Sequence, residues 1–115
     1  HTARALGSMA APGGSWPGVR WALAGRSQAK LDALCNKYAL KPTGIIIADT
    51  SDDASLREMA ARGAVVMNAT GPYRFYGEAV VAACVASGAN YVDLCGEPEF
   101  IDRCILKHSD SAQAA

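Results

Sequence analysis

Arg26 is the residue whose type and position best suit the recognition of a phosphate. It follows a short apolar run, “RWALAG” (residues 20 to 25), which ends at Gly25, and it precedes Ser27, a candidate helix cap. In dinucleotide-binding folds, a carboxylate after the second strand binds the 2′-hydroxyl of NAD, whereas an arginine there pairs with the 2′-phosphate of NADP. A guanidinium fork and the amides of a helix start both favour an anion. Arg26 is therefore a candidate NADP-reading residue, and the alternative is an ordinary solvated arginine.

Carboxylates follow two other apolar runs. Asp49 ends “TGIIIAD” (43 to 49) and can border an adenine ring, although a turn residue beside a helix cap explains it better. Asp93 lies near the end of “NYVDL” (90 to 94), and Glu97 follows this run. Both can face a substrate or a nicotinamide. The sequence favours the simpler interpretation, in which both are solvated loop carboxylates near a helix start.

An aromatic segment, “GPYRFYGE” (71 to 78), follows the apolar run “AVVMNA” (64 to 69), which contains Asn68. Gly71 allows a ligand to approach the backbone closely, and Pro72 stiffens the chain. The rings of Tyr73, Phe75 and Tyr76 can form a wall beside a cofactor or pack against a neighbouring part of the protein. We do not expect all three to be simply exposed, because clustered apolar groups of this kind usually contact something.

Several motifs of known enzymes are missing from the sequence. No Gly-x-Gly-x-x-Gly turn lies between a strand and a helix, and the tyrosines are not followed four residues later by lysine, which argues against an epimerase. No Gly-x-Ser-x-Gly elbow occurs. The four cysteines (35, 84, 95 and 104) and two histidines lack the spacing of a metal site, so we expect buried, reduced thiols. No residue can be assigned as the catalytic acid.

The composition gives no reason to expect a nucleic-acid partner or a membrane-spanning segment. The chain has 115 residues, of which half are apolar, and its 11 basic residues equal its 11 acidic ones. A net charge of zero gives no electrostatic reason to expect binding to nucleic acid. The longest apolar run, “AVVAACVA” (79 to 86), is far shorter than the ~20 residues that a membrane span needs.

The order of apolar runs predicts an α/β fold with four βα units. Strands are expected at 20–25, 43–49, 64–69 and 90–94. Helices are expected after Ser27, after Ser51 or Asp52, at 77–87, and from Pro98 onward. The inward face of the last helix is expected to carry Phe100, Ile101, Cys104, Ile105 and His108. Short continuous apolar strands suit a doubly wound, Rossmann-type parallel sheet that is covered on both faces. Residues 1–19 are rich in Ala, Gly, Pro and Ser and are expected to be a flexible leader, followed by an incomplete NAD(P)-binding domain at 20–115.

Long stretches of the chain resemble the amino-terminal part of the saccharopine dehydrogenase-like oxidoreductases. The similarity runs from about Trp21 to the end, and “GPYRFYGE” and “YVDLCGEPEF” are its most specific parts. The resemblance implies a Rossmann-type NAD(P) domain, followed by a second α/β domain with the substrate site and the contacts of a homodimer. It further implies an oxidoreductase that acts on a small or lipid-like substrate, with members at membranes and lipid droplets. Among the residues, Gly25 and Arg26 match the family's second-strand end, and Asn68, Gly71 and Pro72 match its fourth-strand loop.

The chain departs from this family at its amino terminus. The family opens with a strand and a glycine-rich turn, which residues 1 to 20 replace, and that strand is the central one of the sheet. We therefore expect two strand pairs with unpaired backbone groups, each costing ~1–3 kcal/mol when buried, against a total stability of only ~5–15 kcal/mol. Two hypotheses follow: the chain is a piece of an NADP-linked oxidoreductase, or it is a non-catalytic remnant that binds no cofactor and associates through exposed sheet edges.

Overall fold

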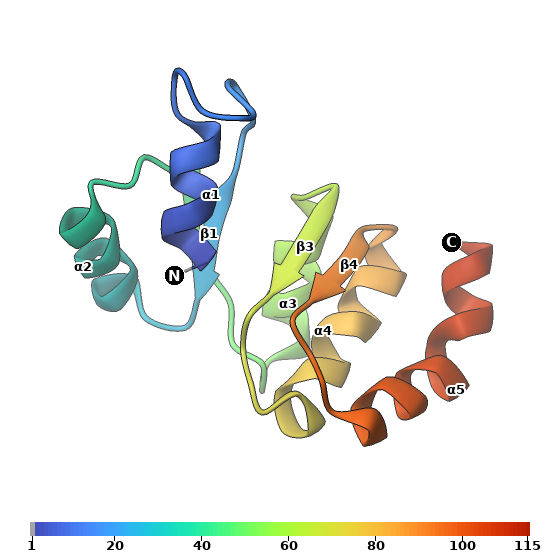
Figure 1. Ribbon diagram of the computed structural model, residues 1–115. Helices are drawn as coiled ribbons and strands as arrows, with labels where there is room; N and C mark the ends of the chain where they lie inside the picture. Colours follow the sequence, from blue (N-terminus) through green and yellow to red (C-terminus); the bar gives the residue numbers. More distant parts are fainter. Residues whose placement is uncertain (1) are drawn as a thin grey trace. The chain divides into compact units, whose positions relative to one another are not determined.

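The computed structural model describes residues 2 to 115, and these residues form two compact units (Figure 1). The first unit reaches to Ile47 and the second runs from Ala48 to Ala115. Each unit contains one pair of parallel strands, so the strands make two separate two-stranded sheets. All four predicted strands are present, in the predicted alternation with helices, which confirms a partial Rossmann-type α/β fold.

The first unit pairs its two strands in parallel and places one helix between them along the chain. Its elements are α1 (Thr2–Ala10), β1 (Ala22–Gly25), α2 (Gln28–Tyr38) and β2 (Gly44–Ile47). Ala22 lies opposite Gly44, and Gly25 lies opposite Ile47. Ser27 caps α2 as predicted, because its side-chain oxygen accepts a hydrogen bond from the Lys30 amide at 3.4 Å.

Helix α1 lies within the segment expected to be a flexible leader, and the sequence analysis did not predict it. Its residues include several strong helix formers, notably alanine, leucine and methionine. The helix packs closely on the rest of the unit at Gly7, where an added Cβ would lie 2.9 Å from Leu40 and 3.3 Å from the Trp21 ring. The Arg4 guanidinium also lies 5.6 Å from the centre of the Tyr38 ring. The residues before β1 therefore supply a packed helix.

The first unit has no fully buried side chain among its described residues. Exposed and partly covered residues alternate along β1, and Ile47 of β2 is 49% exposed. The prediction that these strands are buried on both faces is therefore wrong for this chain. The physical reason is that α1 and α2 do not provide enough apolar surface to enclose a two-stranded sheet.

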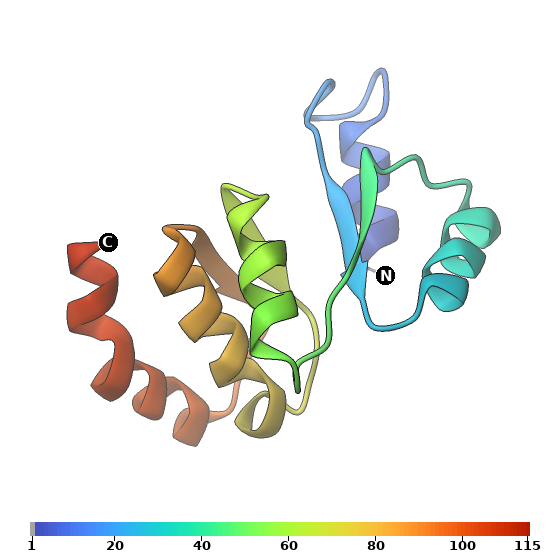
Figure 2. The same ribbon diagram turned by 180° about the vertical axis from the view of Figure 1, so that it is seen from behind.

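The second unit carries the core of the molecule. Its elements are α3 (Asp53–Ala61), β3 (Val65–Asn68), α4 (Tyr73–Ser87), β4 (Asn90–Asp93) and α5 (Pro98–Ala114). Strands β3 and β4 are parallel, with Val65 opposite Asn90 and Asn68 opposite Asp93. Figure 2 shows α3 and α4 side by side. Asp52 caps α3 and Gly88 ends α4 in a left-handed conformation, both as predicted.

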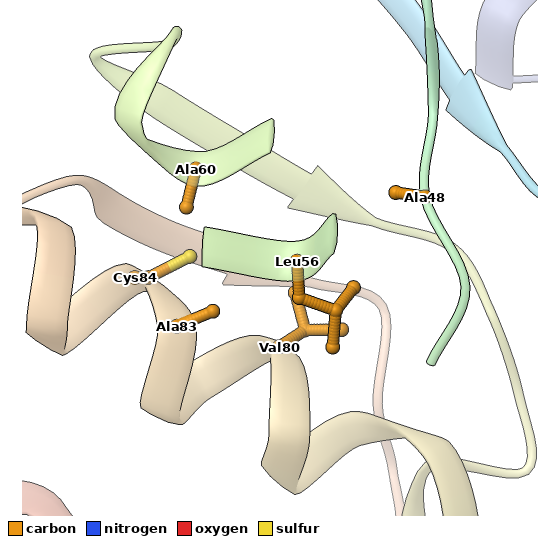
Figure 3. Close-up of a cluster of buried hydrophobic side chains, with 6 residues drawn as sticks. All are labelled: Ala48, Leu56, Ala60, Val80, Ala83 and Cys84. Atoms are coloured by element: carbon orange, nitrogen blue, oxygen red, sulfur yellow. The ribbon is translucent and has the colours of Figure 1, made fainter. Parts of the chain in front are cut away.

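Small residues let α3 and α4 approach closely in this core (Figure 3). The buried cluster comprises Ala48, Leu56, Ala60, Val80, Ala83 and Cys84. Val66 and Tyr91, from the inner face of the strand pair, pack against it. The side chains of Val65, Met67 and Val92 are 44–57% exposed, so these strands too are covered on one face only in the described part of the chain.

Helix α5 packs on α4 through the contact between Phe100 and Gly77. Phe100 is 2% exposed, as the predicted inward face requires. A Cβ added at Gly77 would lie 2.5 Å from the Phe100 ring. Ile101 and Ile105, which were predicted to face inward, are 41% and 59% exposed, so that part of the prediction is wrong. The spacing of apolar residues in α5 predicted an inward face of five residues. Packing on α4 buries only a narrow stripe of the helix.

We expect Gly77→Ala to destabilise the chain even though alanine is the better helix former. The new methyl group would overpack the Phe100 contact at a cost of about 1–3 kcal/mol. This cost exceeds the roughly 0.5–1 kcal/mol that alanine gains over glycine inside a helix. Urea unfolding of both chains measures the difference. The matched control is Ala86→Gly, on the exposed side of α4, where alanine should be the more stable residue. A stabilised Gly77→Ala chain would contradict the tight contact.

Candidate functional site

The carboxyl ends of β3 and β4 lie side by side, since Asn68 is opposite Asp93. Two segments follow these ends: residues 69–72, which are exposed and lead into α4, and residues 94–97, which lead into α5. The carboxyl edge of a parallel sheet is the usual place for ligands in α/β folds. We therefore treat this edge of the second unit as the first part of the candidate site.

Asn68 is buried at this edge, with 6% of its surface exposed. Its side-chain amide donates to the Tyr91 hydroxyl at 3.3 Å, and its side-chain oxygen accepts from the Thr70 amide at 3.0 Å. Its backbone carbonyl accepts from the Tyr73 hydroxyl at 2.9 Å. Asn68 therefore fixes the path of the chain into the exposed segment rather than presenting its side chain to solvent.

Tyr91 and Asp93 extend this hydrogen-bond network along β4. The Tyr91 hydroxyl donates to Asp93 Oδ2 at 2.7 Å, and Asp93 Oδ1 accepts from the Cys95 amide at 2.9 Å. Desolvation, together with the bond to Asp93, raises the pKa of Tyr91 above its ordinary value. Both oxygens of Asp93 thus have partners within the unit, so it is not simply a solvated loop carboxylate, and its role toward a substrate stays a prediction.

Tyr73 is buried, and so it is not part of an exposed aromatic wall. Its hydroxyl donates to Asn68 and accepts a 3.4 Å bond from the Leu94 amide. Its ring centre lies 5.7 Å from that of Phe100. Tyr73 therefore joins the segments after β3 and β4 and packs against α5.

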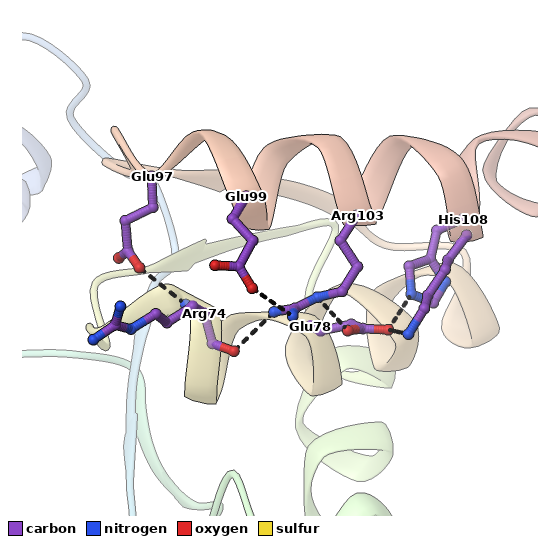
Figure 4. A network of polar contacts seen from close by, with 7 residues as sticks. Arg74, Glu78, Glu97, Glu99, Arg103 and His108 are labelled. Carbon is purple, nitrogen blue, oxygen red and sulfur yellow. Dashed lines mark hydrogen bonds and ion pairs between the residues drawn. The ribbon is translucent and has the colours of Figure 1, made fainter.

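Glu97 caps α4 from a different part of the chain. Its Oε2 accepts from the Tyr73 amide at 2.8 Å and its Oε1 accepts from the Arg74 amide at 3.2 Å (Figure 4 shows the bond to Arg74). Sequence reasoning placed the start of this helix at residue 77, and the structure corrects that to Tyr73. The first turn was missed because Pro72 at the N-cap has no capping side chain and the cap comes from Glu97, 24 residues after Tyr73 and 23 after Arg74.

A second polar cluster ties α5 to α4 (Figure 4). Arg103 pairs with Glu78 at 2.9 Å and donates to the Arg74 carbonyl at 2.8 Å. Lys107 also pairs with Glu78, at 3.0 Å, and His108 lies 3.5 Å from the same carboxylate, where it pairs when protonated. The hydrogen bond from Lys107 holds the pKa of Glu78 below its ordinary value, against the opposing effect of partial desolvation. This cluster fixes the outer side of the first turn of α4.

The groups that remain open to a ligand lie just outside this network. Gly71 and Pro72 are exposed and are joined by a cis peptide bond. Near Gly71, the closest atoms to an added Cβ belong to the Tyr73 ring at 3.8 Å, so the backbone there is accessible. Phe75 and Tyr76 are 67% and 44% exposed, whereas Tyr73 is buried, so the three aromatic side chains are not all exposed. They lie on the first turn of α4, not on a loop.

The first unit holds the other candidate residues. Arg26 follows β1 directly, its side chain is exposed, and it makes no ion pair or hydrogen bond with any side chain of the described residues. Gly25, the last residue of β1, is close to α2, since an added Cβ would lie 3.3 Å from Leu31. Arg26 thus stands between a strand end and a helix start, as the sequence predicted.

Asp49, in the second unit, forms a turn that leads into α3. Its carboxylate accepts from the Ser51 amide at 2.9 Å and from the Ser51 hydroxyl at 2.7 Å. These bonds agree with the simpler of the two interpretations, in which Asp49 is a turn residue beside the Asp52 cap. They leave its role toward a cofactor as a prediction.

No metal site is found in residues 2–115, where no group of three or more His, Cys, Asp or Glu side chains comes together. The four cysteines are free; Cys84 is buried and the others are partly covered. Burial raises the pKa of the Cys84 thiol to about 11, so this thiol stays protonated near neutral pH. Within the same described range, no helix is both long and apolar enough to cross a membrane.

Comparison with known proteins yields a match over almost the whole chain. A family model described as “Saccharopine dehydrogenase NADP binding domain” matches residues 4–115, and so includes most of α1. The human protein named saccharopine dehydrogenase-like oxidoreductase is 49% identical over 100 residues, which cover 80% of this chain and 23% of the human one.

Two more distant organisms supply further relatives. A Caenorhabditis elegans protein named lipid droplet localized protein is 44% identical over 102 residues, covering 84% of this chain and 24% of that protein. A Mycobacterium ulcerans (strain Agy99) protein named trans-acting enoyl reductase is 42% identical over 97 residues, covering 82% of this chain and 23% of that protein. This chain thus spans about a quarter of the length of these relatives. No solved structure gives a significant match.

Proposed function

The chain belongs to the family of saccharopine dehydrogenase NADP-binding domains, and on this basis we propose that it is the nucleotide-binding part of an NADP-dependent oxidoreductase. The family match over residues 4–115 is the observation that carries this proposal. We propose that the reaction, the substrate and the rest of the site belong to a longer protein resembling the human relative, of whose length this chain spans about a quarter.

The residues of the first unit fit one end of the cofactor. An exposed guanidinium with no side-chain partner among residues 2–115, placed between β1 and the start of α2, suits the 2′-phosphate that distinguishes NADP from NAD. We assign this role to Arg26, with Gly25 and Ser27 beside it. Ser27 orders the first turn of α2 by capping it, which keeps the adjacent amide dipoles aligned toward an anion.

Residues of the second unit are also proposed to contact the cofactor. Gly71 and Pro72 offer exposed backbone at the end of β3, while Asn68 and Tyr73 hold that backbone in place. Asp49 is proposed to border the adenine ring. When bound, NADP supplies a hydride carrier, and the protein's contribution to such chemistry is mainly to bind and orient the reacting groups.

We propose that the substrate of the longer protein is lipid-like and carries a carbonyl, an imine or an activated C=C bond. The names of two relatives, lipid droplet localized protein and trans-acting enoyl reductase, support this class of substrate. The first of these names also supports a place at lipid droplets.

A second candidate function is a non-catalytic remnant that binds no cofactor. Two observations favour it for this chain: its strands form two separate pairs, and residues 2–47 contain no fully buried side chain. A unit without a core provides little rigidity for holding a nucleotide.

Calorimetric titration with NADPH distinguishes these two functions. We expect this chain alone to bind NADPH weakly or not at all, and the longer protein to bind it with roughly micromolar affinity, equivalent to about 8 kcal/mol. Micromolar binding by this chain alone would rule out the remnant. Absence of binding by the longer protein would rule out the proposed function.

A further inference from the structure

Glu97 holds the first turn of α4 although it belongs to the segment between β4 and α5. We propose that Glu97 is a positioning residue for the exposed segment 69–72, and through it for the bound cofactor. This inference rests on the proposed function, since it takes residues 69–72 to contact the nucleotide. Neither the family description nor the names of the relatives assigns a role to this residue.

The start of α4 has no cap of its own. The first amides of a helix lack intrahelical partners, and Ser, Thr, Asp or Asn at the N-cap usually satisfies one of them. Here the N-cap is Pro72, which makes no side-chain cap bond. The carboxylate of Glu97 instead accepts from two consecutive amides, those of Tyr73 and Arg74. A negative charge at this end of a helix is also favourable to the helix dipole.

Glu97 is itself held firmly enough to act as an anchor. Its own amide lies 3.2 Å from Cys95 Sγ, and Pro98 begins α5 immediately after it. From α5, Arg103 donates to the Arg74 carbonyl at 2.8 Å, so the first turn of α4 is bound on both sides. The position of the capping carboxylate therefore depends on the position of α5.

The exposed segment is fixed at both of its ends. At one end Asn68 is buried and bonded to Thr70 and to Tyr91; at the other, Tyr73 is buried and its amide is bonded to Glu97. Only residues 69–72 between them are free to touch a ligand. Loss of the Glu97 carboxylate would release one end and let the accessible backbone at Gly71 change its position.

The same carboxylate determines where a phosphate does not bind. An uncapped helix start is a favourable site for anions, because its amides and its dipole both attract negative charge. At α4 these amides are already occupied by an anionic side chain. The phosphates of the cofactor are thus directed away from these amides, and the segment after β3 is left to contact uncharged parts of the nucleotide.

Amide hydrogen exchange in this chain tests the structural half of the inference. In Glu97→Ala, the amides of Tyr73 and Arg74 should exchange about 10–100 times faster, the effect expected for losing hydrogen bonds to a charged group, while amides of the core helix α3 stay unchanged. Formate, a small carboxylate, should restore the protection by binding at the vacated amides, and Glu97→Gln should retain part of it. The matched control is Glu99→Ala, an exposed carboxylate two residues away.

Unchanged exchange in Glu97→Ala, or an equal change in Glu99→Ala, would overturn the inference. So would a failure of formate to restore protection. If Glu97→Ala proves too unstable to study, Glu97→Gln is measured in its place. Only a capping role for residue 97 predicts faster exchange that is confined to the amides of Tyr73 and Arg74.

The NADPH affinity of the longer protein tests whether Glu97 positions the segment that is proposed to contact the cofactor. There Glu97→Ala should weaken NADPH binding about tenfold, formate should recover the loss, and Glu99→Ala should have no effect. An unaltered affinity in Glu97→Ala would remove Glu97 from cofactor positioning while leaving the proposed function intact. Absence of NADPH binding by the unaltered longer protein would instead overturn the proposed function itself and the cofactor role of Glu97 with it, whatever the exchange data show.

Discussion

Replacing Arg26 by glutamate in the longer protein should weaken NADPH binding about 100-fold while changing NADH binding by no more than about threefold. Hydrogen bonds between charged partners contribute about 1.5–3 kcal/mol, which corresponds to roughly 10–150-fold in affinity. The side chain is exposed and has no side-chain partner within the described part of the chain, so the substitution is expected to remove an interaction with the ligand and not an internal one. The negative charge of glutamate would also repel the 2′-phosphate, which NADH lacks.

Two further substitutions identify the cause of such a loss. Arg26→Lys keeps the charge but not the planar fork, so it should lose part of the NADPH affinity. Lys30→Glu changes an equally exposed charge in the first turn of α2 and should affect both cofactors only slightly. Fluorescence titration with each cofactor provides the measurement. Equal losses for NADPH and NADH in Arg26→Glu would remove Arg26 from the 2′-phosphate site.

The strands were predicted well because their signal is local. Four short apolar runs correspond to β1, β2, β3 and β4 to within two residues at either end. The caps at Ser27 and Asp52 were equally visible, since each lies directly before the helix that it caps. Information carried by neighbouring residues is therefore enough to order the elements and to indicate the fold class.

The start of α4 was not predictable in this way, because its cap is supplied by Glu97. The segment “GPYRFYGE” gives no sequence signal for a helix start. Proline occupies the N-cap, and Gly77, a poor helix former, lies in the second turn. Gly77 is tolerated because Phe100 packs over it, which again depends on a residue far along the chain. Sequence reasoning consequently assigned Tyr73 to a loop and Glu97 to solvent, whereas a long-range hydrogen bond joins them.

The exposure of the sheets has a different cause. The apolar strands predicted a sheet covered on both faces, yet Val65, Met67 and Val92 face outward and are about half exposed or more. Composition records how much apolar surface a strand carries, but it does not show what covers that surface. In the described residues, α3 and α4 cover only the face that carries Val66 and Tyr91.

Phe100→Ala should destabilise the second unit more than any other single substitution considered for this chain, by about 3–5 kcal/mol. Phe100 is 2% exposed, and it contacts both the Tyr73 ring and Gly77. Removing it leaves a cavity between α4 and α5 that glycine cannot fill. Because native domains have only about 5–15 kcal/mol of stability in total, a loss of this size is a large part of what holds the unit together.

The position of Phe100 makes its effect distinguishable from a general weakening of α5. Leu106 lies on the same helix but is 86% exposed, so Leu106→Ala should change the free energy of unfolding by less than about 0.5 kcal/mol. Urea unfolding followed by tyrosine fluorescence gives both values, and similar losses in the two variants would contradict the packing described for α5. Since Tyr73 rests on Phe100 and Glu97 immediately precedes α5, detachment of α5 should also free the first turn of α4. The segment proposed to contact the cofactor therefore depends on an apolar contact between two helices as well as on its own hydrogen bonds.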